Sequence, residues 1–214
     1  MNKSCKKQGN SAKRFNLHFY RYHEDINVPP RKQISFIFTQ EKFMNQTRKF
    51  ILTAMFIAIG VVLPQAFHAI PNAGSIFLPM HIPVLVSGFV LGPVFGGICG
   101  LVTPILSHLM FGMPPAPMLG QMICELAVYG LCTGLYFNLL KIENLTVKTY
   151  VSLILSMLTG RLVYGVLNAL IFKAGSYSFA AWISAAFVTA LPGIVIQLVL
   201  IPILVIRLKK ANLF

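Results

Sequence analysis

The sequence predicts an all-α membrane protein, a bundle of six transmembrane helices, and two observations support this prediction. Apolar stretches begin at residue 50 and follow one another almost to the C-terminus, and 56% of the 214 residues are hydrophobic. Only two acidic residues, Glu125 and Glu143, lie beyond residue 43. An ionised side chain in the hydrocarbon of a bilayer costs about 3 kcal/mol or more, so this scarcity is typical of a membrane-embedded chain.

The chain is long enough for six spans of about 20 residues joined by short loops. Gly92-Pro93 separates the second span from the third, because glycine favours the end of a helix and proline its first turn. A proline-rich loop, residues 113–117, precedes the fourth span. The expected spans are residues 49–66, 80–92, 93–111, 117–139, 148–172 and 183–206.

Basic residues are distributed unequally over the loops, which predicts that both termini lie in the cytoplasm (N-in/C-in). The outer loops hold only Lys173, and an excess of Lys and Arg is typical of cytoplasmic flanks. The first outer loop, residues 67–79, contains Pro71, Gly74 and Pro79, and we expect it to be structured. The basic residues of the cytoplasmic flanks are Arg48, Lys49, Lys141, Lys148, Arg207, Lys209 and Lys210.

Residues 1–43 carry nine Lys and Arg against three acids and differ in composition from the membrane domain at 44–214. We expect a disordered cytoplasmic tail, and a start at Met44 is the alternative. The net charge of +13 would suit a nucleic-acid-binding protein. Because most of the cations lie in this segment and near helix ends, we expect the lipid bilayer, and no nucleic acid, as their partner.

Two polar stripes cross the expected fourth and fifth spans. Gln121 and Glu125 are four residues apart and share a helix face, and Tyr129 continues that stripe. Arg161, Tyr164 and Asn168, at spacings of three and seven, also share one face. With the topology above, both stripes lie largely in the outer half of the membrane. An intramembrane Glu and Arg are not expected to face lipid. Either they form an ion pair that holds the two helices together, or they line a polar pocket for a ligand. A pocket with the ion pair at its base would satisfy both interpretations.

Three further residues are candidates for the same pocket. His81 begins the second span on the outer side, Asn72 lies in the first outer loop, and Trp182 lies near the outer end of the sixth span. Trp182 belongs either to an interfacial aromatic belt or to a surface that stacks on a ring-shaped ligand. The histidines and cysteines have no spacing typical of metal ligands, so we expect no metal site.

Small residues recur at four-residue spacing on two of the expected helices. Small faces let helices approach closely in lipid. Gly92, Gly96 and Gly100 fit packing inside the bundle. Ala54 and Ala58 on the first span form either an internal contact or a docking face for another membrane subunit.

Several catalytic motifs are missing from the sequence. It has no GxxxxGK[ST] loop for nucleotide phosphates, no GxSxG and no HExxH. The chain therefore has no phosphate-binding loop of its own for ATP. If the protein moves a solute uphill, an ion gradient or a partner must supply the energy.

The motifs taken together resemble the substrate-binding membrane subunits (S components) of energy-coupling factor (ECF) transporters, the bacterial vitamin importers. The resemblance covers about residues 44–210. It implies six helices without catalysis, a vitamin bound near the outer face beneath the first loop, and docking of the Ala54/Ala58 face on a transmembrane coupling subunit that connects to two ATPases. The matching pieces are Ala54-x-x-x-Ala58, GSIFLPMHIPVLVSGFVLGP (74–93), GGICGLVTPILSHLMFGMPP (96–115), Glu125-x-x-x-Tyr129-Gly130 and TGR (159–161).

The function predicted from this resemblance is capture of a water-soluble vitamin or precursor in the bacterial plasma membrane, with ATP used by the partner subunits. Pantothenate and cobalamin-precursor subunits are the more similar groups. A carboxylate ligand would favour a free Arg161, whereas a neutral heterocycle would leave it paired with Glu125. The alternatives are a self-sufficient ion-coupled permease, an intramembrane enzyme using Glu125 with His81 or His108, and a membrane scaffold.

Overall fold

The computed structural model describes residues 46–67, 73–172 and 178–211, and this part of the chain is helical without strands. The expected N-terminal tail at 1–43 and Asn72 lie outside the described residues. The helices are α3 (Gln46–Val62), α4 (Ala73–Phe77), α5 (His81–Leu91), α6 (Pro93–Phe111), α7 (Ala116–Leu139), α8 (Leu145–Leu167), α9 (Phe179–Ile183) and α10 (Leu191–Lys210), with 3₁₀ turns in η2 (Leu63–Phe67) and π-helix in η3 (Asn168–Phe172) and η4 (Ser184–Thr189).

Five helical stretches in the described part are long and apolar enough to cross a membrane, namely α3–η2, α6, α7, α8–η3 and α10. Two further apolar helices, α5 and the segment from α9 through η4, are shorter. Most of the predicted spans correspond to one element each. The sixth, predicted as one helix over 183–206, differs: the long helix begins at Leu191 and continues to Lys210. Pro192 explains this start, because proline lacks an N–H and fits best in the first turn of a helix.

Glycine, proline and asparagine set the helix ends, as the sequence predicts for the boundary between α5 and α6. Gly92 has a φ of 90°, its N–H donates to the carbonyl of Gly88, and Pro93 opens α6. Gly112 ends α6 with a φ of 67°, a conformation that costs glycine little. Asn144 caps α8 by accepting bonds from the N–H groups of residues 146 and 147, at 3.0 and 3.4 Å.

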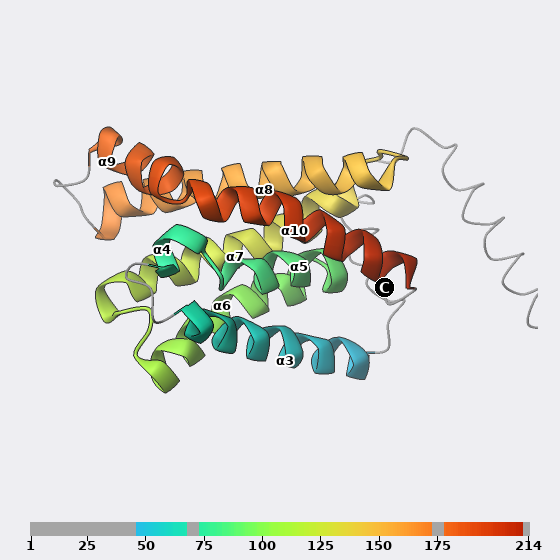
Figure 1. The fold of residues 1–214 in the computed structure, drawn as a ribbon, viewed down its shortest axis with the longest axis horizontal. Coiled ribbons are helices and arrows are strands. Elements are labelled where there is room, and N and C mark those ends of the chain that lie inside the picture. The colour runs from blue at the N-terminus through green and yellow to red at the C-terminus, as the bar shows by residue number, and fades with distance from the viewer. Residues whose placement is uncertain (1–45, 68–72, 173–177, 212–214) are drawn as a thin grey trace, which may run out of the picture. The chain divides into compact units, whose positions relative to one another are not determined.

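Helix α7 lies at the centre of the bundle and packs against α5, α6 and α8. Figure 1 shows α8 and α10 on one side of α5 and α7, with α3 on the other. Glycines bring α6 and α7 into backbone contact: a Cβ on Gly96 would lie 2.5 Å from the carbonyl oxygen of Gly130, and one on Gly100 would collide with the backbone of Leu126. The interpretation of Gly96 and Gly100 as packing residues is therefore confirmed.

The outer faces of the helices carry large apolar side chains that the fold leaves uncovered. Leu109, Leu170 and Phe179 are each more than 70% exposed. Uncovered apolar residues continue along α3, α6, α8 and α10. A protein in water rarely exposes so much contiguous apolar surface, whereas a bilayer covers it at no cost. The pattern agrees with a multi-pass membrane protein.

Candidate functional site

The centre of the candidate site is an ion pair between α7 and α8. The Arg161 Nη1 atom lies 3.2 Å from the Glu125 Oε1 atom, and both residues are buried, with exposures of 6% and 3%. The helical spacing that predicted a polar stripe on each helix therefore leads to a direct contact between the stripes. Removing one partner of such a pair would leave the other as an uncompensated buried charge.

Two more side chains approach the same carboxylate oxygen of Glu125. The Tyr129 hydroxyl donates a hydrogen bond to Oε1 at 3.1 Å, and the His81 Nε2 atom lies 3.9 Å from it. The rings of His81 and Tyr129 meet edge to face, with centroids 5.3 Å apart. Gly160 on α8 leaves room for the Tyr129 ring, since a Cβ at this position would overlap it. Helices α5, α7 and α8 each contribute to the cluster of His81, Glu125, Tyr129 and Arg161, here called the polar cluster.

Buried polar atoms in and near the polar cluster have no hydrogen-bond partner among the described residues. A buried polar group without a partner costs about 1–3 kcal/mol, and most such groups in proteins are satisfied by protein, water or ligand. This set therefore offers both donors and acceptors to a bound molecule. The atoms are Nε and Nη2 of Arg161, both ring nitrogens of His81, Oε1 of Gln121, Oδ1 of Asn168 and Nε2 of Gln197.

Gln121 and Asn168 lie towards the end of the bundle where α7 begins and α8 ends. Gln121 is one turn before Glu125 on α7, or about 6 Å along the helix axis. Asn168, the first residue of η3, is seven residues after Arg161 of α8, or about 10 Å. Both are buried, with exposures of 3% and 0%. The unpaired groups thus continue from the ion pair towards one end of the bundle.

The other predicted site residues have different surroundings. The Trp182 Nε1 atom donates to the carbonyl oxygen of Arg161 at 3.1 Å, so its N–H is bonded to backbone. Tyr164 is half-buried, and its carbonyl oxygen accepts a bond from the Asn168 Nδ2 atom at 2.8 Å. Asn72 falls outside the described residues. The structure thus joins His81, Glu125 and Arg161 directly and connects Trp182 to the arginine backbone.

Two residues of this region are missing from the predicted site. Tyr129 is fully enclosed, at 1% exposure, and bonds to Glu125. Its position four residues after Glu125 was the available signal, because residues at that spacing share a helix face. Gln197 on α10, buried at 1%, has its Nε2 atom unpaired within the described part of the chain.

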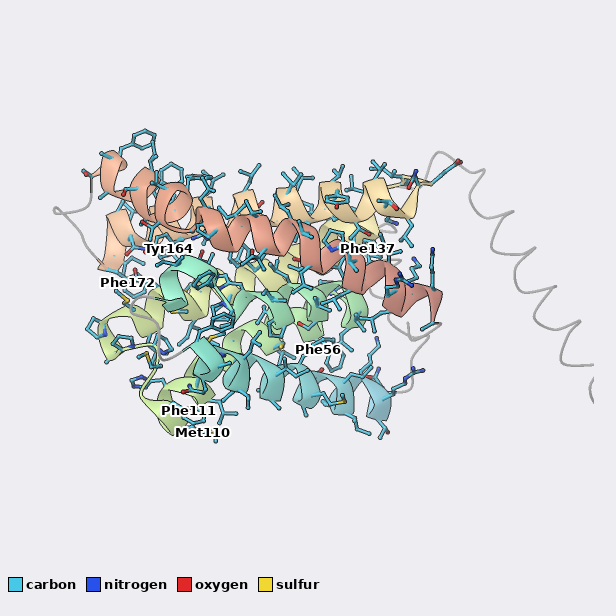
Figure 2. All side chains as sticks on the ribbon, viewed as in Figure 1. Phe56, Met110, Phe111, Phe137, Tyr164 and Phe172 are labelled. Carbon is cyan, nitrogen blue, oxygen red and sulfur yellow. The ribbon has the colours of Figure 1, made fainter. Side chains whose placement is uncertain are left out.

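The opposite end of the bundle is basic. Figure 2 shows Phe137 towards the end away from Tyr164 and Phe172. The ammonium groups of Lys148 and Lys209 lie over the Phe137 ring, at 4.8 and 5.2 Å from its centroid. The ion pair and these cations therefore belong to different ends of the bundle, in agreement with the asymmetry expected from the sequence.

The small residues of α3 face outward. Ala54 and Ala58 are exposed on the surface of the described bundle. Neighbouring side chains of α3 are large, apolar and exposed as well, including Met55 at 53% and Ile59 at 47%. The exposure of Ala54 and Ala58 favours docking on another subunit over internal packing, and docking stays a prediction.

The arrangement of the histidines bears on the enzyme alternative. The His81 Nε2 and Glu125 Oε1 atoms are 3.9 Å apart, which is longer than the hydrogen bond that a directly coupled acid–base pair requires. The His108 Nδ1 atom lies 2.7 Å from the carbonyl oxygen of Pro114, so this ring bonds to the loop after α6. No group of three potential metal ligands occurs among the residues that the structure describes.

The family comparison agrees with this site. The family model of the ECF transporter substrate-specific component matches residues 48–205, about three quarters of the chain, including all of α5, α6, α7 and α8. No curated protein and no solved structure gives a significant match. The family is a transporter component that binds substrate and is not an enzyme class. The match confirms the resemblance predicted from the motifs, and the chain belongs to the substrate-specific components of energy-coupling factor transporters.

Proposed function

We propose that this protein captures a small water-soluble vitamin or vitamin precursor at the polar cluster and presents it for ATP-driven import. The observation that carries this proposal is the set of buried donors and acceptors around Glu125 and Arg161 that lack partners in the described structure. In a chain of a substrate-specific family, such atoms have their simplest explanation in a bound substrate.

The proposed orientation is a six-span protein of the bacterial plasma membrane with both termini inside. The basic end at Phe137 then faces the cytoplasm, as the excess of Lys and Arg favours. The polar cluster lies towards the other end, in the outer half of the membrane, where it would meet substrate from outside. Pantothenate and cobalamin precursors are the ligand classes that we favour.

Energy for transport is proposed to come from the ECF module, because substrate-specific components of this family work with a coupling subunit and ATPases. This chain has no GxxxxGK[ST] loop, so ATP would be used by the two ATPase subunits and no cofactor is expected here. The exposed face around Ala54 and Ala58 on α3 supports docking of the coupling subunit, since small residues permit close helix contact.

The experiment that tests capture measures the thermal stability of the full chain, purified in detergent, against a panel of vitamins and precursors. A ligand that binds only the folded protein stabilises it by about 2.7 kcal/mol at a concentration of 100 Kd. The panel contains pantothenate, niacin, benzimidazole and its riboside, and cobalamin. We expect a single chemical class to raise the melting temperature.

A matched control is Lys141→Ala, which alters an exposed residue at the basic end. This variant should respond to the ligand as the unaltered protein does, whereas Asn168→Leu, in the buried polar stripe, should respond less. A folded preparation that responds to no member of the panel would contradict the proposal. An undiminished response in both variants would place binding elsewhere in the protein.

A further inference from the structure

The guanidinium of Arg161 uses only part of its hydrogen-bonding capacity. Its Nη1 atom faces Glu125 at 3.2 Å, and its Nε and Nη2 atoms are buried without a hydrogen-bond partner in the described part of the chain. The N–H groups of Nε and Nη2 project in parallel from one edge of the planar group. An edge of this kind matches the two oxygens of a carboxylate, which it binds through two parallel hydrogen bonds.

The surroundings of Arg161 hold this edge in place. Glu125 fixes the Nη1 end of the group, and Trp182 fixes the main chain by donating to the Arg161 carbonyl oxygen at 3.1 Å. The indole lies against Gly165 one turn further along α8, where a Cβ would stand 2.5 Å from the indole nitrogen. A donor edge fixed before the ligand arrives loses less entropy on binding, which favours affinity.

Glu125 contacts the guanidinium through its Oε1 atom, which faces Nη1 and not the Nε/Nη2 edge. Its Oε1 atom already faces Arg161 Nη1, accepts the Tyr129 hydroxyl and lies 3.9 Å from His81. A second anionic group is therefore the best partner for the unused edge. Because the Arg161 side chain is only 7% exposed, each bond made there would be shielded from water and strong.

By the criterion drawn from the sequence, a paired Arg161 would indicate a neutral heterocycle, but the pair with Glu125 engages only Nη1. We propose that the unused Nε/Nη2 edge of Arg161 binds a carboxylate group of the transported molecule, so that the substrate is a carboxylic acid and not a neutral heterocycle. This inference rests on the proposed capture function and narrows it to the acidic class, of which pantothenate is an example.

Asn168 adds a second requirement. Its Nδ2 atom donates to the Tyr164 carbonyl, so its unpaired Oδ1 atom can accept a hydroxyl or amide proton about 10 Å along the helix axis from Arg161.

The test compares acids with neutral counterparts of nearly the same shape on the purified full chain. The pairs are pantothenate with panthenol, niacin with nicotinamide, and biotin with biotinamide, and binding is measured by calorimetry and by melting temperature. Two hydrogen bonds to a charged group should make one acid bind about tenfold to a hundredfold more tightly than its neutral counterpart.

The outcomes separate this inference from the capture function. If an acid binds and its neutral counterpart binds at least tenfold more weakly, the inference is supported. If an acid and its counterpart bind equally, or if only neutral compounds such as benzimidazole bind, the carboxylate inference is overturned while capture stands. If no compound binds to a folded preparation, both proposals fail, and water alone would occupy the arginine edge.

The variant Arg161→Lys tests whether the preference for an acid over its neutral counterpart comes from the guanidinium. Arg161→Lys keeps a positive charge for Glu125 but removes the planar edge, and it should reduce the ratio of acid to neutral affinity at least fivefold. Asn168→Leu is the matched comparison, because it should weaken the acid and the neutral compound alike and leave the ratio unchanged. An unchanged ratio in folded Arg161→Lys would overturn the inference. If that variant does not fold, the ligand pairs on the unaltered protein decide.

Discussion

Neutralising Glu125 should destabilise the bundle through the arginine that it leaves behind. In Glu125→Gln the amide oxygen can still accept the Tyr129 hydroxyl, so the main loss is the negative charge 3.2 Å from Arg161 Nη1. Breaking a buried ion pair by removing one partner costs about 3–5 kcal/mol. The loss of stability in Glu125→Gln should be near the lower end of this range, because glutamine retains the shape of glutamate and one of its acceptor oxygens.

Removing both charges should be less harmful than removing either alone. The double variant Glu125→Gln/Arg161→Met has no uncompensated buried charge, and replacing a buried pair by neutral residues of similar size is often close to neutral. Because the double variant is expected to cost less than either single variant, a double-mutant cycle should give a coupling energy of at least about 3 kcal/mol between Glu125 and Arg161. Glu143→Gln is the control, since this exposed loop acid should change stability by no more than about 0.5 kcal/mol.

The assay is denaturant unfolding in detergent micelles, followed through the fluorescence of Trp182, the single tryptophan of the chain. Its indole bonds to α8 near the ion pair and therefore reports separation of the 178–189 segment from that helix. Single-variant losses that simply add in the double variant, within about 0.5 kcal/mol, would show that the two charges do not interact. The electrostatic reasoning would then be refuted.

Three further outcomes are expected. Ala54→Trp should block transport in the assembled importer and leave ligand affinity unchanged. The control Val199→Trp, at a 56% exposed position on α10, should change neither transport nor affinity. Loss of ligand affinity in Ala54→Trp would contradict a role of this residue in docking. Gly130→Val should lower the melting temperature markedly, because a Cβ there collides with the α6 backbone, and an unchanged value would dispute that contact. Trp182→Phe should cost about 1 kcal/mol in unfolding followed by circular dichroism, because it removes the bond to Arg161, and a cost near zero would show that this bond contributes nothing.

Much of the fold follows from hydropathy and from the residues that end helices. The boundary at Gly92-Pro93 appears where the sequence predicts it, because the need for a positive φ and the loss of an N–H are local effects. The region before α10 could not be predicted in the same way. There the π-helix at Ser184–Thr189 and the restart at Leu191 interrupt an apolar stretch, and hydropathy does not distinguish one helical register from another.

The candidate site was predictable where it depends on spacing within one helix. The stripes through Glu125 and Arg161 were visible because residues four and seven apart share a helix face. Which polar stripes meet depends on how α7 packs against α8. Gly160 of α8 leaves space for the Tyr129 ring, and the Tyr129 hydroxyl can therefore bond to Glu125. The contact of Trp182 with the Arg161 carbonyl joins residues 21 apart and has no signal in local sequence.

The two interpretations of Arg161 left open by the sequence, a structural pair or a ligand contact, are compatible because a guanidinium has more than one hydrogen-bonding edge. The contact with Glu125 engages Nη1 and leaves Nε and Nη2 unpaired within the described residues. The pair also serves binding, since it sets the direction in which the unused edge points. A lysine at position 161 could satisfy Glu125 but could not present two parallel donors to a second carboxylate. An ion pair with Glu125 alone does not require an arginine at position 161. The presence of arginine there is therefore the strongest argument that this residue also contacts the substrate.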